Sequence, residues 1–243
     1  MPRSTLPLQT LKIHLRLAET NEIFSLPQCQ NDLTLKQLKS DLELLTGIPF
    51  HFQRLHYLDE IDLPDDSTFM DNDIVPGGTI TMRIWKQDGW GHLVAAAVKG
   101  DTLKLVQLGV TEEYAGTSPY AKILGPEQKK EWVAHRAFVA LFVASHRGHV
   151  NTVKFLLSHG ADVRSKTPLG RTALHVAAVM GRCECIELLF KIATYREEKL
   201  FLPVDVEVGR WQWGRQGVSQ HHNQLRVAAL HPPPTVVLHL SPV

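Results

Sequence analysis

Two pairs of residues and a set of cysteines have the types and spacing that could support chemistry. Thr172 and His175 are close enough along the chain to act as a nucleophile and a base. His146 and His149 have the same spacing, which on a helix would place both imidazoles on one face as ligands for a metal ion. The remaining candidate nucleophiles are the cysteines, Cys29, Cys183 and Cys185.

The chain offers no further residues that would complete any of these sites. Neither the Thr–His pair nor a Cys–His175 pair has a recognisable third group to orient the base. His146 and His149 lack a third ligand at a suitable spacing. Cys183 and Cys185 point in different directions on a helix and cannot readily share a metal, and Cys185 suits a small buried position. We therefore expect no enzymatic activity and no catalytic, cofactor or metal site.

The overall charge argues against nucleic acids and membranes as partners. The chain of 243 residues has 26 lysines and arginines against 25 aspartates and glutamates, so its net charge of +1 creates no global field that attracts polyanions. The longest apolar run, from Phe138 to Ala144, is far shorter than the roughly 20 residues of a membrane span. We read no secretory signal at the N-terminus, and the cysteines form no paired framework. We expect a cytoplasmic or nuclear protein with protein partners, and the oligomeric state stays open.

The N-terminal third has the patterning of a small mixed sheet with one helix. Four segments are expected as strands: 11–17, 23–26, 53–58 and 79–84. The first and the last alternate apolar and polar residues. Between the second and third, leucines recur at helical spacing from Leu35 to Leu45. Thr34 is the expected N-cap of this helix, and Gly47 lies just past its end. This order of elements predicts a helix that packs on a sheet.

Short motifs in this region resemble ubiquitin in order and spacing. The most specific are Gly47 to Pro49, which reads GIP, and Gln53 to Leu55, which reads QRL. They are followed by an acidic, loop-forming stretch at 63–69 and by Gly78 to Ile80. The resemblance implies a β-grasp fold over residues 11–86. It also implies a set of core residues: Leu15, Leu17, Leu35, Leu38, Leu42, Leu55 and Ile80.

The chain departs from ubiquitin at the positions that decide how ubiquitin works. Ubiquitin-like modifiers end in a free Gly-Gly, whereas here the last expected strand runs into Trp85 to Trp90 and onward. The resemblance therefore implies a domain that cannot be conjugated. The apolar patch by which ubiquitin is recognised should fall at His56 and Arg83, whose side chains do not form an apolar patch.

The C-terminal part contains an internal repeat of 33 residues, measured from Gly148 to Gly181. The ten residues that end at each of these glycines align without a gap, and a weaker copy ends at Gly100. The copy that starts at Thr172 reads T-x-L-H-x-A-A, which resembles the ankyrin family. In that family the Thr172 and His175 positions bond the turn to the helix start, so the resemblance implies a structural role for this pair.

The predicted fold is α+β with two domains, a ubiquitin-like β-grasp domain followed by an all-α ankyrin-repeat solenoid. The expected divisions are a flexible N-terminus at 1–10, the β-grasp domain at 11–86, the repeats at 89–190 and a largely unstructured tail at 191–243. Within the repeats we expect a degenerate repeat at 89–110, an insertion at 111–130 and two repeats at 135–163 and 168–190.

Stacked repeats build a binding surface and carry no inherent chemistry, so the function is sought in partners. Eight residues are expected to line the surface: Lys99, His146, Arg147, Arg164, Lys166, Arg171, Val179 and Met180. The basic residues among them could instead serve only solubility. The expected function is a non-enzymatic adaptor that binds one protein through the repeats and docks a second through the β-grasp domain. The alternative is an adaptor that links a client to the ubiquitin–proteasome system.

Overall fold

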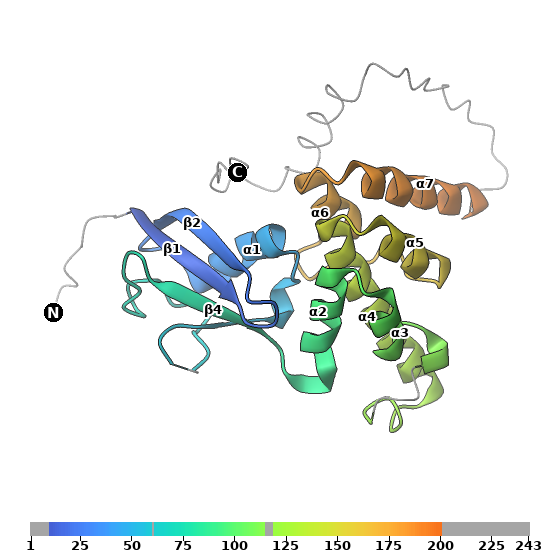
Figure 1. Ribbon diagram of the computed structural model, residues 1–243, viewed down its shortest axis with the longest axis horizontal. Coiled ribbons are helices and arrows are strands. Elements are labelled where there is room, and N and C mark those ends of the chain that lie inside the picture. The colour runs from blue at the N-terminus through green and yellow to red at the C-terminus, as the bar shows by residue number, and fades with distance from the viewer. Residues whose placement is uncertain (1–9, 60, 115–118, 201–243) are drawn as a thin grey trace, which may run out of the picture. The chain divides into compact units, whose positions relative to one another are not determined.

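The computed structural model describes residues 10–59, 61–114 and 119–200 (Figure 1). The chain divides into two compact units, residues 1–96 and 97–243, which are described in turn. Among the described helices, none combines the length and apolarity that a membrane span requires.

The first unit is a four-stranded mixed sheet with one long helix. Its strands are β1 (Thr10–Leu17), β2 (Ile23–Gln30), β3 (Gln53–His56) and β4 (Thr79–Ile84), and its helices are α1 (Leu35–Thr46) and the 3-10 turn η1 (Phe50–Phe52). The strand order is β2-β1-β4-β3. β1 pairs antiparallel with β2 and parallel with β4, and β3 pairs antiparallel with β4. This is a β-grasp arrangement, as the sequence predicted.

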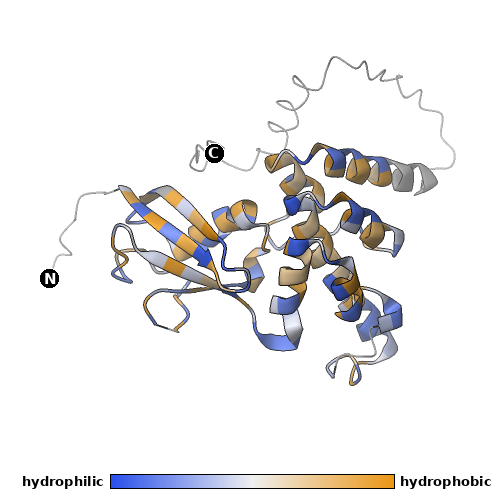
Figure 2. Cartoon of the chain, viewed as in Figure 1, coloured by the Kyte–Doolittle hydropathy of each residue, from blue (hydrophilic) through white to orange (hydrophobic). Residues whose placement is uncertain are grey.

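The sheet has one buried and one solvent face because apolar and polar residues alternate along its strands. Along β1, Leu11, Ile13, Leu15 and Leu17 are buried, and polar residues separate them (Figure 2). The helix adds its own apolar side to this core. All seven core residues expected from the sequence are at most 2% exposed: Leu15, Leu17, Leu35, Leu38, Leu42, Leu55 and Ile80.

Both predicted ends of α1 are confirmed. The Thr34 side chain accepts a hydrogen bond from the Gln37 backbone N–H, and Gln37 Oε1 accepts one from the Thr34 N–H, which together form a capping box. Gly47 ends the helix in the left-handed conformation, with φ of 74°, and its N–H donates to the Glu43 carbonyl over 3.1 Å.

Strand lengths differ from the prediction in two places. β2 continues to Gln30 instead of ending at Leu26, because its pairing with β1 resumes after a register shift. β3 ends at His56 instead of Leu58, because Leu58 has a φ of 64° and leaves the extended conformation.

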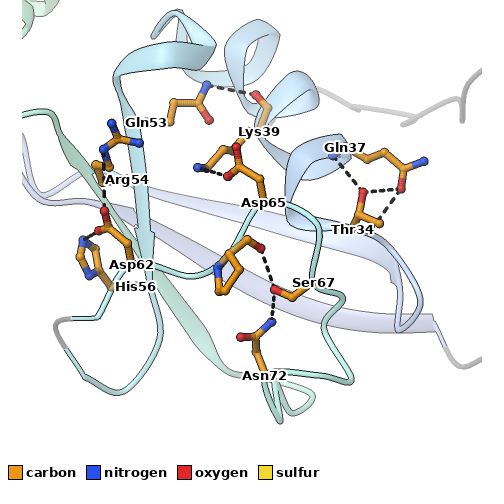
Figure 3. A network of polar contacts seen from close by, with 11 residues as sticks. Thr34, Gln37, Lys39, Gln53, Arg54, His56, Asp62, Asp65, Ser67 and Asn72 are labelled. Carbon is orange, nitrogen blue, oxygen red and sulfur yellow. Dashed lines mark hydrogen bonds and ion pairs between the residues drawn. The ribbon is translucent and has the colours of Figure 1, made fainter.

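Buried polar groups tie α1 to the rest of this unit (Figure 3). The Lys39 ammonium, whose side chain is 4% exposed, pairs with the Asp65 carboxylate from the long loop before β4. Gln53 Nε2 donates to the Lys39 carbonyl over 3.0 Å and to the Ile48 carbonyl over 2.9 Å. The loop and the start of β3 are therefore both held to the helix.

The second unit consists of helix pairs. Before it, at the end of the first unit, lie the 3-10 turn η2 (Gln87–Gly89) and most of α2 (Trp90–Lys99). The helices that follow are α3 (Thr102–Gln107), α4 (Pro126–Arg147), α5 (Val150–Ser158), α6 (Ala173–Val179) and α7 (Cys183–Leu200), with the 3-10 turn η3 (Glu112–Tyr114). α4 packs against α5 and α6, and α7 packs against α6 and α5 (Figure 1). The helix hairpins expected between positions 137 and 190 are present.

The boundary between the units lies inside α2, after Ala96, rather than at 86–89 as the sequence suggested. Residues 90–96 of α2 belong to the first unit, where the ring centroid of Trp90 lies 4.5 Å from that of Phe52.

Two further boundaries differ from the prediction. α4 begins at Pro126, inside the expected insertion at 111–130, because Pro126 suits the first turn of a helix and Trp132 and Val133 pack with Ala121 and Leu124. α7 continues to Leu200, so an unstructured tail from 191 is wrong for residues 191–200. This stretch contains no glycine or proline to stop the helix. Thr10 likewise belongs to β1, while residues 1–9 and 201–243 lie outside the described part of the chain.

Successive repeats are joined by the same contact. In each case a side chain contacts a backbone carbonyl of the preceding repeat. The side chain directly follows the glycine of its own repeat, and the carbonyl lies two residues before the glycine of the preceding repeat. His149 Nε2 lies 2.6 Å from the Val98 carbonyl, and Arg182 Nε donates to the His146 carbonyl over 3.0 Å. Thr152 adds a hydrogen bond from its hydroxyl to the Gly100 carbonyl over 3.0 Å.

We expect Gly148→Ala to destabilise the second unit more than Gly170→Ala. Both glycines have similar positive φ, 82° and 77°, so each substitution has a backbone cost of about 1–2 kcal/mol. A Cβ at position 148 would lie 2.9 Å from Arg182 Cδ, whereas one at 170 meets no atom within 4 Å. Displacing Arg182 adds about 1 kcal/mol for the lost hydrogen bond. Urea unfolding followed by circular dichroism measures the free energy of unfolding of both variants. In an Arg182→Ala background the extra loss caused by Gly148→Ala should disappear. An extra loss that persists there would contradict the proposed clash with Arg182.

We expect Asp65→Ala to destabilise the first unit by about 1–3 kcal/mol, because it leaves the Lys39 ammonium buried without its ion-pair partner. Lys39→Met keeps the apolar stem and removes the charge, so it should cost less than Asp65→Ala. Chemical unfolding of both variants makes the comparison. Equal losses would show that the ion pair itself, rather than the buried charge, provides the stability.

Candidate partner-binding surface

Three of the predicted surface residues occupy the same position in successive repeats. Lys99, Arg147 and Met180 each directly precede the glycine that follows a first helix, at Gly100, Gly148 and Gly181. Lys99 is exposed, and Arg147 and Met180 are half-buried. The inter-repeat contacts of His149 and Arg182 hold these helix ends at a regular spacing. The row therefore presents two cationic side chains and one flexible apolar side chain.

His146 does not belong to this surface, so its predicted role in binding a partner is wrong. It is 1% exposed, because its position in the long helix α4 faces the packed interior. Its backbone carbonyl serves the repeat contact by accepting from Arg182. Val179, at the equivalent position of the last repeat, is half-buried and retains some exposed surface.

A tight turn before α6 carries the other predicted cations. The Gly170 N–H donates to the Thr167 carbonyl over 2.8 Å, and the Thr167 N–H donates to the Arg171 carbonyl over 2.8 Å. Gly170 permits this turn because its φ is 77°. At the tip lies Leu169, which is 41% exposed and which the sequence reasoning missed. The sequence contains a pattern that predicts this exposure. Leu169 occupies a central position of a Thr-Pro-Leu-Gly turn, where side chains point outward.

The predicted cations of this turn differ in their surroundings. Arg164 and Lys166 are exposed and Arg171 is half-buried. Arg164 lies 3.9 Å from the Asp162 carboxylate, an exposed pair of small energetic value. Lys166 and Arg171 are close enough to the next helix to act on His175: burial lowers the pKa of that imidazole, and the two cations lower it further. The turn thus brings two positive charges beside a neutral histidine.

The Thr172 and His175 pair is a helix cap. The Thr172 N–H donates to His175 Nδ1 over 3.2 Å, and Thr172 Oγ1 accepts from the His175 N–H over 3.4 Å. This reciprocal capping box uses the groups that a nucleophile and base would need. A neutral imidazole suits this role because its unprotonated Nδ1 can accept. The role implied by the ankyrin resemblance is therefore what the structure shows.

The other candidate chemical groups are also accounted for. His149 contacts the Val98 carbonyl, and the described residues contain no group of three or more His, Cys, Asp or Glu side chains that could hold a metal ion. The three cysteines are free thiols, with Cys29 and Cys185 buried and Cys183 exposed. Burial, with a smaller effect of Asp41, raises the pKa of Cys29 to about 11, and burial also raises that of Cys185.

The fold and this surface define an α+β protein that joins a β-grasp sheet to stacked helix pairs. Among known families, the model described as ankyrin repeats (3 copies) matches residues 93–198. Similar solved structures include a protein designed from ubiquitin, which is 24% identical over 32% of this chain and 92% of that chain, with a TM-score of 0.29. Ubiquitin of Caldiarchaeum subterraneum is 16% identical over 32% and 96%, and the UBL domain of Plasmodium falciparum Dsk2 is 17% identical over 32% and 100%; both have a TM-score of 0.29.

The chain therefore carries ankyrin repeats over residues 93–198, and these imply protein partners. The β-grasp assignment of the first unit stands on its strand order and its single long helix. Both folds are typically non-enzymatic.

We expect thiol alkylation of the folded protein at neutral pH to modify Cys183 well before Cys29 and Cys185. Cys183 is exposed, whereas the other two are buried and have raised pKa values, so little thiolate is present at pH 7. Mass spectrometry after timed iodoacetamide treatment follows each site, and a urea-unfolded sample is the control in which the three rates should converge. Rapid modification of a buried cysteine in the folded protein would reopen the question of a nucleophilic role.

Proposed function

We propose that this protein is a non-enzymatic adaptor, which binds one protein partner through the ankyrin repeats and uses the β-grasp unit as a second docking module. The proposal includes no catalytic or cofactor role. It places the adaptor in the cytoplasm or nucleus, since three free thiols favour a reducing compartment.

The observation that carries the proposal is the row of Lys99, Arg147 and Met180 together with the turn before α6. Two basic side chains of the row and those of the turn, Lys166 and Arg171, offer charge-assisted hydrogen bonds to carboxylates, and arginine can bind a carboxylate through two bonds. Met180 and Leu169 offer apolar contacts beside them. A partner surface with aspartate or glutamate around an apolar centre fits this combination.

The alternative, delivery of a client to the ubiquitin–proteasome system, gains no support from the sheet. The face that would have to meet ubiquitin receptors carries His56, buried and paired with Asp62 over 3.1 Å, and the half-buried Arg83. It offers cationic and polar groups rather than an apolar patch.

The test is affinity capture with the full chain and with an Arg147→Glu, Met180→Glu variant, followed by quantitative mass spectrometry. Reversing the charge of Arg147 and introducing a charge at the neighbouring Met180 position of the row should reduce recovery of a specific partner at least tenfold, since such hot-spot changes cost about 1.4 kcal/mol or more.

A matched control carries Lys154→Glu and Asn151→Glu on α5, where both side chains are exposed and lie away from the row in the repeat pattern. It makes the same kind of charge change and should retain the partner. Thermal melts confirm that both variants fold. If every partner captured by the parent chain is also captured by the Arg147→Glu, Met180→Glu variant, the repeat surface proposed here is wrong.

A further inference from the structure

The last described repeat, formed by α6 and α7, has a face on which no further described repeat packs. α4 packs against its own partner α5 and also against α6, the first helix of the next repeat (Figure 1). Among the described helices, α6 is in extensive contact only with α4 and α7. Equivalent positions of these two repeats are 33 residues apart, so their exposure can be compared directly.

Positions that are buried in the earlier repeat keep exposed surface in the last one. Leu157 is 7% exposed, whereas its equivalent Phe190 is 52% exposed. Leu141, Val153 and His146 are at most 1% exposed. Their equivalents in the last repeat are half-buried: Leu174, Ile186 and Val179. All four positions in the last repeat are apolar, so this face has hydrophobic surface that a following helix can bury.

The sequence beyond α7 contains a match to the first helix of a repeat. Residues 223–232 read N-Q-L-R-V-A-A-L-H-P and align without a gap on residues 172–181, which read T-A-L-H-V-A-A-V-M-G. The identical positions include those of Val176 and Ala177, which are fully buried in α6. Asn223 stands at the position of the N-cap Thr172 and is itself a favoured N-cap residue.

The spacing of this match also resembles that of the earlier repeats. Pro232 lies 51 residues after Gly181, and Gly148 lies 48 residues after Gly100, so both steps exceed the 33-residue period by a similar length. Residues 201–222, which precede the match, include one proline and three glycines, the residue types of connections. Three prolines follow the match and cannot continue a helix, so the pattern predicts a single helix over 223–231.

We propose that residues 223–231 form the first helix of a further repeat, which packs on α6 as α6 packs on α4 and so caps the array from within the same chain. Leu174 and Val179 then become core residues, as Leu141 and His146 are in the earlier repeat. The cap replaces the expectation of an unstructured tail for this segment. A segment of the same chain has an effective concentration on the order of millimolar at this face, which favours it over a second copy.

The cap also changes the surface available to a partner. Val179 leaves that surface, as His146 did, while Met180 keeps its place in the row with Lys99 and Arg147. His231 occupies the next position of the row, directly before Pro232 in place of the glycine. The cap itself does not depend on the proposed adaptor function, and only the place of His231 in the row rests on it.

The first test measures how well the face is covered in the full chain. The thiol introduced by Val179→Cys is treated with iodoacetamide, and its alkylation is followed by mass spectrometry. Adding Leu225→Asp and Ala228→Asp should raise the rate at least tenfold, because charged side chains cannot be buried against α6. The matched control adds the same charge just before the segment, with Ser219→Asp and Gln220→Asp, and should keep the slow rate.

Cys185 serves as an internal reference because it is buried beneath this face. Its slow alkylation in every variant shows that the last repeat stays folded. Equal rates for the Val179→Cys thiol with and without Leu225→Asp and Ala228→Asp would overturn the proposal. Protection that increases with protein concentration would overturn it as well, since a second copy would then cover the face.

The second test decides the matter even if the aspartate variant unfolds the last repeat. The full chain carries a photoreactive diazirine amino acid at position 179, and mass spectrometry maps the crosslinks formed on irradiation. Links to residues 223–231 of the same molecule are expected. Links only to other residues or to a second molecule, or no links at all, would reject the cap. Neither test uses a partner, so both are independent of the capture experiment with Arg147→Glu and Met180→Glu.

Discussion

The second unit depends on a close approach of backbone and side chain at the glycine that ends each first helix. Gly100 and Gly148 adopt positive φ, and a Cβ at either position would lie within 3.0 Å of the next repeat, against His149 or Arg182. The absence of that carbon lets these side chains reach a carbonyl of the preceding repeat. The same contact, made twice, sets the distance between neighbouring helix pairs and keeps their first helices in register.

This constraint also shapes the surface available to a partner. The residue before each glycine sits at the end of a helix whose backbone is already bonded to the next repeat, so Arg147 is held by a rigid support. Binding by such a surface loses less conformational entropy than binding by a mobile loop. The turn before α6 is stiffened in a similar way by hydrogen bonds between Thr167 and Gly170 and between Thr167 and Arg171.

In the first unit, the residues that stabilise the fold and the residues that form the solvent face are different ones. On the core side, α1 is held by the ion pair of Lys39 with Asp65 and by the two hydrogen bonds that Gln53 donates. On the solvent side, the alternating strands leave charged and apolar groups that take no part in the core. Changes at Arg16 or Leu58 therefore leave the packing of the core side of the sheet intact.

Sequence periodicity determined a helix on a small sheet, the caps at Thr34 and Gly47, and the helix pairs around Gly148 and Gly181, because each follows from local spacing or from one residue's backbone preference. The β-grasp fold and its core residues came from the resemblance to ubiquitin. It could not decide exposure in a helix that packs on several sides, which is why His146 was mistaken for a surface residue. Nor did it show how far α4 and α7 extend, since helix ends depend on contacts such as those of Trp132. Only the tertiary structure showed that Val179 and Phe190 keep exposed surface where His146 and Leu157 are buried, because burial of these positions depends on whether another repeat packs on that face.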